Sequence, residues 1–252
     1  MLSTLKGSQR PPRKHGNNIM LQPTSKESKL RELAAKGVHQ AAARVLPHYI
    51  SPPGRVVELG AGAGAFSHRL RMLGYVVTGS DVEATQFNAA GVPFVCCDLD
   101  AEWPEALQRS CPDALCAVEV IEHLRHPWKF FEQCHSMLRS GGILLLSTPN
   151  ISSKWSRAYF LAKGVPLGFG RRNMLAIGHI NPLTSDEIDH IASSTGFELL
   201  RRIPVGRFLP PECADVRDRL WHFVFSCFVA LLRPVMRNLE DGYCYVMAYR
   251  RI

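Results

Sequence analysis

Four acidic residues stand at or just beyond the ends of short apolar runs in the first half of the sequence. They are Glu58, Asp81, Asp98 and Glu119. If the apolar runs are parallel strands, their carboxyl ends border one crevice, and the four carboxylates converge on it. Asp81 can accept hydrogen bonds from two ribose hydroxyls, Asp98 from an adenine amino group, and Glu58 can favour an ammonium group. The pattern therefore indicates a nucleoside that carries an amino acid, whereas a pyrophosphate would be repelled.

A glycine-rich segment connects the first apolar run to a helical pattern. It reads Gly60-Ala61-Gly62-Ala63-Gly64 and directly follows Val56-Val57-Glu58-Leu59. Glycines let a backbone turn sharply and approach a ligand without a Cβ in the way. The spacing is G-x-G-x-G, not the G-x-G-x-x-G that is typical of NAD sites, and a helix is expected before the first strand. Both features argue against a nicotinamide dinucleotide.

Apolar runs and helical patterns alternate along the chain, and these elements must position the acids. An amphipathic helix is predicted first, from about residue 26 to Leu46, where Pro47 ends the pattern. We then expect strands at 55–59, 75–80, 93–97, 114–119, 143–148, 197–205 and 243–249, and helices at 63–73, 127–138 and 184–196. Strands this apolar are buried on both faces, which predicts an α/β fold with a parallel sheet.

Residues 54–200 resemble the class I S-adenosylmethionine-dependent methyltransferases, on the glycine segment, the acids and Cys116 to Leu124. The resemblance implies a Rossmann-like three-layer sandwich with a mostly parallel seven-stranded sheet and an antiparallel last strand. It implies methyl transfer from S-adenosylmethionine, whose cationic sulfonium suits an acidic crevice. The cofactor-binding residues that it implies are Glu58, Gly60, Ala61, Gly62, Gly64, Asp81, Val82, Asp98, Leu99 and Glu119.

Methyl transfer to oxygen needs a base for the acceptor's proton, and His123 and His179 are the candidates, with Glu122 as a third catalytic residue. The run Glu119-Val120-Ile121-Glu122-His123, followed by a later histidine, resembles two subfamilies. One is the ubiquinone-pathway O-methyltransferases. The other is the small-RNA 2'-O-methyltransferases, in which two glutamates and two histidines bind a divalent metal. A metal on Glu119, Glu122, His123 and His179 and a role in cofactor and substrate contact alone both stay open.

The net charge of +8 is concentrated in residues 1–18 and 151–184, which contain nine Lys and Arg residues and no acid. This segregation favours an anionic partner, although basic loops can also serve solubility alone. The second segment resembles bacterial methyltransferases of surface-glycan and glycolipid assembly. That resemblance implies a glycan or lipid-linked acceptor whose phosphates meet Arg157, Arg171 and Arg172. A quinone-like phenol is the other small-molecule acceptor.

Two alternatives to this function remain. The first is metal-assisted RNA 2'-O-methylation, but the chain lacks a separate RNA-binding motif, so nucleic acid is not the expected partner. The second is a module that binds S-adenosylmethionine without turnover, which the complete set of predicted cofactor residues cannot exclude.

Residues 1–22 are predicted to be a disordered basic arm, and 23–252 a single methyltransferase domain with insertions at about 151–178 and 206–240. Residues 220–232 carry no charge but are too short to span a bilayer, which needs about 20 apolar residues. Three interpretations stay open: a helix packed on the core, a dimer surface, or peripheral membrane contact through 217–237.

The eight cysteines include no C-x-x-C pair, which argues against a zinc site or a disulfide framework and fits a reducing compartment. No apolar stretch follows the basic N-terminal residues as a secretory signal would require. We therefore expect a cytoplasmic protein, with the inner face of the membrane as the alternative location.

Overall fold

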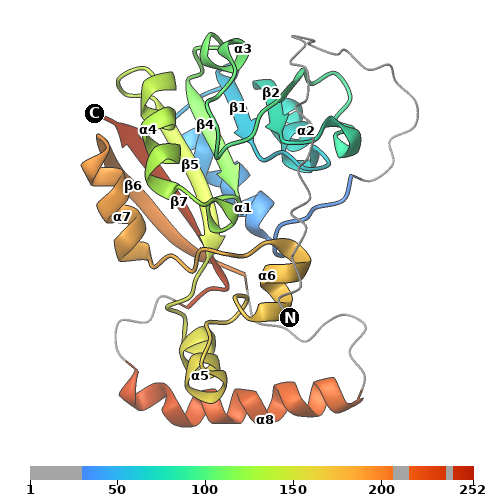
Figure 1. Ribbon diagram of the computed structural model, residues 1–252, viewed down its shortest axis with the longest axis vertical. Helices are drawn as coiled ribbons and strands as arrows, with labels where there is room; N and C mark the ends of the chain where they lie inside the picture. The colour runs from blue at the N-terminus through green and yellow to red at the C-terminus, as the bar shows by residue number, and fades with distance from the viewer. Residues whose placement is uncertain (1–29, 207–215, 237–240) are drawn as a thin grey trace, which may run out of the picture.

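The computed structural model describes residues 30–206, 216–236 and 241–252, and Figure 1 shows one sheet covered by helices on both faces. The predicted arm at 1–22 lies outside these residues. The strands are β1 Arg55–Leu59, β2 Val76–Asp81, β3 Phe94–Cys96, β4 Ala114–Val118, β5 Ile143–Pro149, β6 Phe197–Val205 and β7 Cys244–Arg251. The helices are α1 Val38–Val45, α2 Ala65–Met72, α3 Glu105–Gln108, α4 Pro127–Met137, α5 Lys154–Lys163, α6 Arg171–Ile177, α7 Ser185–Ser194 and α8 Val216–Leu232.

The seven strands lie in the order β3-β2-β1-β4-β5-β7-β6, and β7 runs antiparallel to both of its neighbours. The predicted sheet is therefore confirmed, including its antiparallel last strand. The strands at 55–59 and 197–205 begin and end where the sequence predicts, and in the other strands each end lies within two residues of its predicted place.

Two apolar cores, one on each face of the sheet, produce the predicted three layers. Successive residues of β5 point to opposite faces, as the period of a strand requires. Leu144 and Leu146 belong to the core beneath α4 and α7, whereas Ile143 and Leu145 belong to the core beneath α1 and α2. Every residue of β4 and β5 is buried, so the central strands are shielded from water on both faces.

The first helix is shorter than predicted. α1 begins only at Val38, after Gly37, which has a left-handed φ of 91°. The preceding residues instead lie against the sheet end, where the Ala35 N–H donates to a Glu119 carboxylate oxygen at 2.8 Å. A long-range contact and a left-handed glycine therefore overrule the helical pattern over residues 30–37; residues 26–29 of the predicted helix lie outside the described residues.

The insertion at 151–178 contains α5 and α6, which the scattered apolar residues did not predict. Local caps mark the ends of these helices, and α5 also packs on α8. The Ser153 side chain accepts from the Ser156 N–H at the start of α5, and Gly164 and Gly178 end the two helices in the left-handed conformation. The predicted cap at Thr184 is confirmed, because its hydroxyl accepts from the Glu187 N–H at 3.1 Å.

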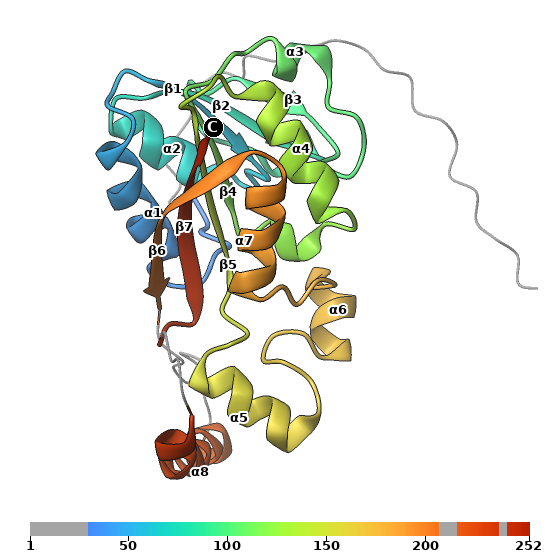
Figure 2. The same cartoon turned by 90° about the vertical axis from the view of Figure 1, so that its left-hand side faces the viewer.

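Both insertions leave the sheet at the edge where β1 to β4 end. Cys244, the first residue of β7, pairs with Pro149 and with Val205, the last residues of β5 and β6. In Figures 1 and 2, α5, α6 and α8 accordingly lie below this edge, with α8 outermost. The insertions thus form a lobe next to the end of the sheet at which the predicted site residues gather.

Two further observations bear on compartment and membrane topology. All seven cysteines that the structure describes carry free thiols. Within residues 30–206, 216–236 and 241–252, no helix combines the length and apolar character needed to cross a bilayer.

Candidate functional site

The glycine segment after β1 turns tightly into α2. Gly60 has φ 71°, and a Cβ there would lie 2.5 Å from Val120 Cγ2. Gly64, at φ 84°, would place a Cβ 2.7 Å from that of Ala89. Neither position has room for a side chain, and neither φ favours one. The loop therefore needs glycine for its own packing, besides any ligand that it approaches.

Asp81 is held at the end of β2 against this turn. One carboxylate oxygen accepts from the Gly62 N–H at 2.8 Å, and the other accepts from the Val82 N–H at 2.6 Å. The Ala61 N–H donates to the Ser80 carbonyl at 2.8 Å and connects the turn to β2. The structure thus brings the predicted residues Ala61, Gly62, Asp81 and Val82 together, with the acid oriented by the backbone.

Glu58 lies under the same turn and is buried. Its carboxyl accepts a hydrogen bond from the Ser67 hydroxyl of α2. Burial raises the pKa of Glu58 to about 8; the hydrogen bonds of Ser67 oppose this shift, and the charge of Asp81 adds to it. Glu58 is therefore largely protonated near neutral pH. A cation bound nearby would favour its ionised form.

The raised pKa of Glu58 predicts how stability depends on pH. In the unfolded chain this group titrates near its ordinary value of about 4.3, so between there and about 8 the folded protein holds one more proton. Stability should therefore fall as pH rises through this window. Glu58→Gln should remove this loss, which amounts to up to about 5 kcal/mol at about 1.4 kcal/mol per pKa unit. Urea unfolding of the ligand-free protein from pH 5 to 8.5 measures it.

Glu105→Gln is the matched control, because the Glu105 side chain is 67% exposed. It should leave the pH dependence of the free energy of unfolding unchanged. A Glu58→Gln variant with the same pH dependence as the wild type would contradict the burial argument.

Asp98 and Leu99 follow β3 at the same edge. Cys96, the last residue of β3, pairs with Asp81, so Asp98 lies two residues further out from the sheet. Its side chain is exposed, and one carboxylate oxygen accepts from the Asp100 N–H at 3.0 Å. Leu99 is buried. The two residues are adjacent at this end of the sheet, and their contacts with an adenine ring stay a prediction.

Glu119, after β4, has the left-handed φ of 53°, a rare conformation for a residue with a side chain. Its carboxylate accepts from the Ala35 N–H and from the Cys244 thiol, both at 2.8 Å. Burial raises its pKa. The sequence did not point to either partner, since they lie 84 and 125 residues away. The cofactor role of Glu119 stays a prediction; its oxygens bind segments far along the chain, whereas those of Asp81 bind the glycine turn and the residue that follows it.

Glu122, His123 and His179 form a cluster beyond the end of β4. Each offers a ligand atom, and these atoms lie within 4.8 Å of one another. The two imidazole rings meet edge to face, with centroids 4.8 Å apart. The backbone holds the two segments together, because the Ile180 and Asn181 N–H groups both donate to the Glu122 carbonyl at 3.0 Å. All three predicted catalytic residues are therefore neighbours.

Burial sets the protonation of this cluster. It raises the pKa of Glu122 to about 8, and the charge of Glu119 adds to the shift. It lowers the pKa of both His123 and His179, so both imidazoles are neutral near pH 7. One Glu122 oxygen accepts from the Thr148 hydroxyl at 3.2 Å, and the other has no hydrogen-bond partner among the described residues. The cluster can accept a proton or bind a cation.

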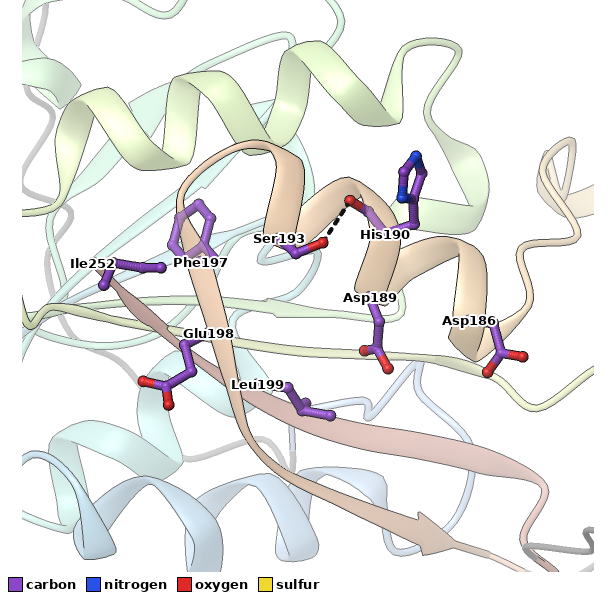
Figure 3. Close-up of a pocket in the computed structure, with 8 residues that line it drawn as sticks. All are labelled: Asp186, Asp189, His190, Ser193, Phe197, Glu198, Leu199 and Ile252. Carbon is purple, nitrogen blue, oxygen red and sulfur yellow. Dashed lines mark hydrogen bonds between the residues drawn. The ribbon is translucent and has the colours of Figure 1, made fainter.

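A separate open groove lies on the outer side of α7 and β6, at the opposite edge of the sheet from β3 (Figure 3). Two of its three acids are paired with arginines: Asp189 pairs with Arg202 and accepts from the Tyr249 hydroxyl, and Glu198 pairs with Arg250. None of the predicted site residues lines it. We therefore place the candidate site at the carboxyl ends of β1 to β4.

Sequence comparisons show which known proteins this chain resembles. Residues 27–202 match the profile of a family described as a methyltransferase domain. A ubiquinone biosynthesis O-methyltransferase of Chelativorans sp. (strain BNC1) is 33% identical over 106 residues, which are 40% of this chain and 42% of the relative. The mitochondrial enzyme of that name from Mus musculus is 29% identical over 108 residues, 38% of this chain and 29% of the relative. Both matches span less than half of the relative's length.

Solved structures show the same architecture. A SAM-dependent methyltransferase from Archaeoglobus fulgidus superposes with a TM-score of 0.57 at 17% identity, over 85% of this chain and 93% of that one. The [4+2]-cyclase SpnF also has a TM-score of 0.57 at 17% identity, over 89% of this chain and 85% of its own. At such identities the likeness shows the fold alone, because one fold hosts different reactions.

Proposed function

Because the chain belongs to the class I S-adenosylmethionine-dependent methyltransferases, we propose that it transfers a methyl group to an oxygen of a small-molecule, glycan or lipid-linked acceptor. One observation carries the proposal. The Asp81 carboxylate, fixed against the glycine turn that follows β1, and the histidine pair beyond the end of β4, the strand next to β1, lie at the same end of the sheet.

The residues at the turn fit S-adenosylmethionine. Among the described residues, a Cβ at Gly62 would meet only the end of the Leu33 side chain within 4 Å, so little of the described chain covers this stretch of backbone. Asp81 would hold the ribose hydroxyls, with Val82 beside it, and Asp98 and Leu99 would hold the adenine. Glu58, kept protonated by burial, would ionise beside the methionine ammonium. When bound, the sulfonium supplies an activated methyl group.

The histidines are suited to take the proton of the acceptor hydroxyl. His179 Nδ1 lies 3.1 Å from the Gly168 carbonyl, which can only accept, so Nδ1 carries the proton and Nε2 is the basic nitrogen. The lowered pKa keeps the imidazole in this neutral form at neutral pH. Positioning and proton acceptance are the contributions that this chain would make to the reaction.

Two observations support an oxygen acceptor that carries phosphate or lipid. The matched curated relatives are named as O-methyltransferases. Residues 151–178, beside the histidine cluster, carry five Lys and Arg residues and no acid, and Arg171 and Arg172 are exposed. Guanidinium groups bind phosphate oxygens in a bidentate manner.

Calorimetry with S-adenosylmethionine, followed by a labelled-methyl screen over phenols, lipid-linked glycans and RNA, tests the proposal. We expect binding, and label transferred to a phenol or glycan oxygen. Failure to bind S-adenosylmethionine would refute the proposal. Binding without transfer to any acceptor would favour a non-catalytic module, and transfer to RNA the ribose 2'-O alternative.

A divalent metal at the histidine cluster is a second candidate feature. The convergence of Glu122, His123 and His179 and the unpaired oxygen of Glu122 favour it. Glu119, the fourth residue of the predicted set, instead binds Ala35 and Cys244 through its two oxygens. Two imidazoles and a carboxylate suit zinc, manganese or iron. Such an ion would polarise an acceptor hydroxyl.

Metal analysis by mass spectrometry distinguishes a histidine cluster that binds a divalent metal from one that does not. If the cluster binds metal, the wild-type protein should retain about one ion per chain after dialysis, and His123→Ala should lose it. His190→Ala, an exposed histidine on α7, is the control and should retain the ion. Full methyl transfer by a metal-free preparation would show that the reaction does not need a metal.

A further inference from the structure

Helix α8 forms the base of the molecule. Figures 1 and 2 show it as the lowest described element in both views, beyond α5 and lying across the long axis of the molecule. One of its faces packs on α5, where Phe225 and Val229 are buried with Ala158. The helix therefore belongs to a small apolar cluster separate from the two cores of the sheet.

The opposite face of α8 is also apolar but is exposed. Leu220, Phe223, Val224 and Leu231 are 61%, 66%, 59% and 78% exposed. Their spacing of three, four or seven residues places them on one side of a helix with 3.6 residues per turn. Val216 and Cys227 fall on the same side. We call these six residues the outer face. A helix that is apolar all round is normally covered on all sides.

Charge indicates what covers the outer face. Arg217 and Arg219 lie on either side of it at the start of the helix, and Arg233 follows its end. Residues 151–178 and 216–236 together contain eight Lys and Arg residues and one acid, Asp218, although the net charge of the whole chain is only +8. An apolar strip flanked by arginines matches the boundary between acyl chains and anionic headgroups.

A second copy of the chain fits this face less well. Two such lobes placed face to face would bring their arginines together, and like charges across an interface oppose association. With 17 residues, α8 is shorter than the roughly 20 apolar residues that cross a bilayer. It can bury its exposed apolar side by lying parallel to the membrane surface.

We propose that α8 docks the protein on a bilayer that contains anionic lipids. The outer face inserts at the headgroup boundary, and Arg217, Arg219 and Arg233 contact the headgroup phosphates. The edge of the sheet that carries the candidate site faces the same lobe (Figures 1 and 2), so docking places that edge toward the membrane. This inference does not depend on the proposed methyl transfer.

Vesicle flotation tests the proposal. The full-length wild-type protein should float with phosphatidylcholine vesicles that contain phosphatidylglycerol, and much less with phosphatidylcholine alone. The double variant Phe223→Glu, Val224→Glu should lower the bound fraction at least about 10-fold, because it puts charge where apolar area was buried. Both residues are exposed, so circular dichroism and Tm should match the wild type.

The matched control is Met72→Glu with Val76→Glu. These residues are 68% and 57% exposed, close to the values for Phe223 and Val224, but they lie on α2 and β2. This control should float like the wild type. Wild-type protein that stays unbound, or an outer-face variant that floats equally well, would overturn the proposal.

Sedimentation equilibrium tests whether a second copy of the chain, and not a bilayer, covers the outer face of α8. A monomer in the absence of vesicles supports lipid docking. A wild-type dimer that the outer-face variant dissociates, together with no flotation, would show that a second copy covers the face and would overturn the proposal. Equal binding to neutral vesicles would overturn the assigned role of the arginines.

Discussion

Asp81→Ala should weaken the binding of S-adenosylmethionine by at least about 100-fold, which corresponds to about 2.7 kcal/mol. Hydrogen bonds to a charged group contribute about 1.5–3 kcal/mol each, and the proposal assigns two ribose hydroxyls to this carboxylate. The backbone already orients the group through the Gly62 and Val82 N–H groups, so binding needs little reordering of the side chain. The alanine variant also leaves the Gly62 N–H in the turn without its acceptor. Isothermal titration calorimetry measures the change.

Two further variants show how much of the loss in affinity comes from the charge of Asp81 and whether it is specific to that acid. Asp81→Asn keeps an oxygen for one backbone N–H but loses the charge, and it should fall between the wild type and alanine. Glu83→Ala removes an exposed acid two residues further on and should bind the cofactor normally. The Tm of each variant reports on the fold. An alanine variant with unchanged affinity would remove Asp81 from the cofactor site.

His179→Ala should lower kcat by about 10²–10⁴-fold on the acceptor found by the labelled-methyl screen, the range expected for loss of a general base. Cofactor affinity should change little, because the cluster lies beyond β4 whereas the glycine turn follows β1. His123→Ala should also lower kcat, since its ring packs against that of His179. If the two histidines act as one unit, the double variant will be no worse than the more damaged single variant.

The pH profile gives an independent test of this role. Burial lowers the pKa of both histidines, so the basic form persists below the ordinary histidine value of about 6.5. On the ionisation of the histidines alone, activity should therefore be constant near pH 7 and fall on acidification past the histidine value; ionisation of Glu122, whose pKa is about 8, would add a separate change on the alkaline side. His190→Ala on α7 should keep both the rate and the profile. If neither His123→Ala nor His179→Ala changes the pH dependence of activity, neither histidine is the base that accepts the proton of the acceptor.

If α8 docks on a bilayer, an acceptor carried on a lipid would reach the site from the membrane side. Both insertions emerge at the carboxyl edge of the sheet, where β5 and β6 end and β7 begins. The phosphate of such an acceptor would pass the basic residues of 151–178. The labelled-methyl screen therefore tests the acceptor, and the flotation assay tests docking on the membrane. The two results can differ independently.

The apolar runs of the sequence predicted the strands, the parallel part of the sheet and the elements that border the site, whereas the antiparallel last strand was implied by the family resemblance. The β1 and β6 bounds and the Thr184 cap were predicted to the residue. These features depend on interactions that are local in the chain or on continuous apolar runs, and such signals survive in a single sequence. The glycine turn and Asp81 were found for the same reason, because strand ends imply their neighbours once the sheet is parallel.

Only the tertiary structure decided the partners that come from far along the chain. The helical pattern over residues 30–37 is not realised, because Ala35 bonds Glu119 across 84 residues. The carboxylate of Glu119 is likewise turned to Cys244 of β7, and α5 is stabilised by packing on α8, from a separate insertion. The periodicity of the sequence does not predict these long-range contacts, because they depend on which distant segments pack together in the folded chain. The structure also exposes the outer face of α8, whose sequence alone reads equally well as buried core.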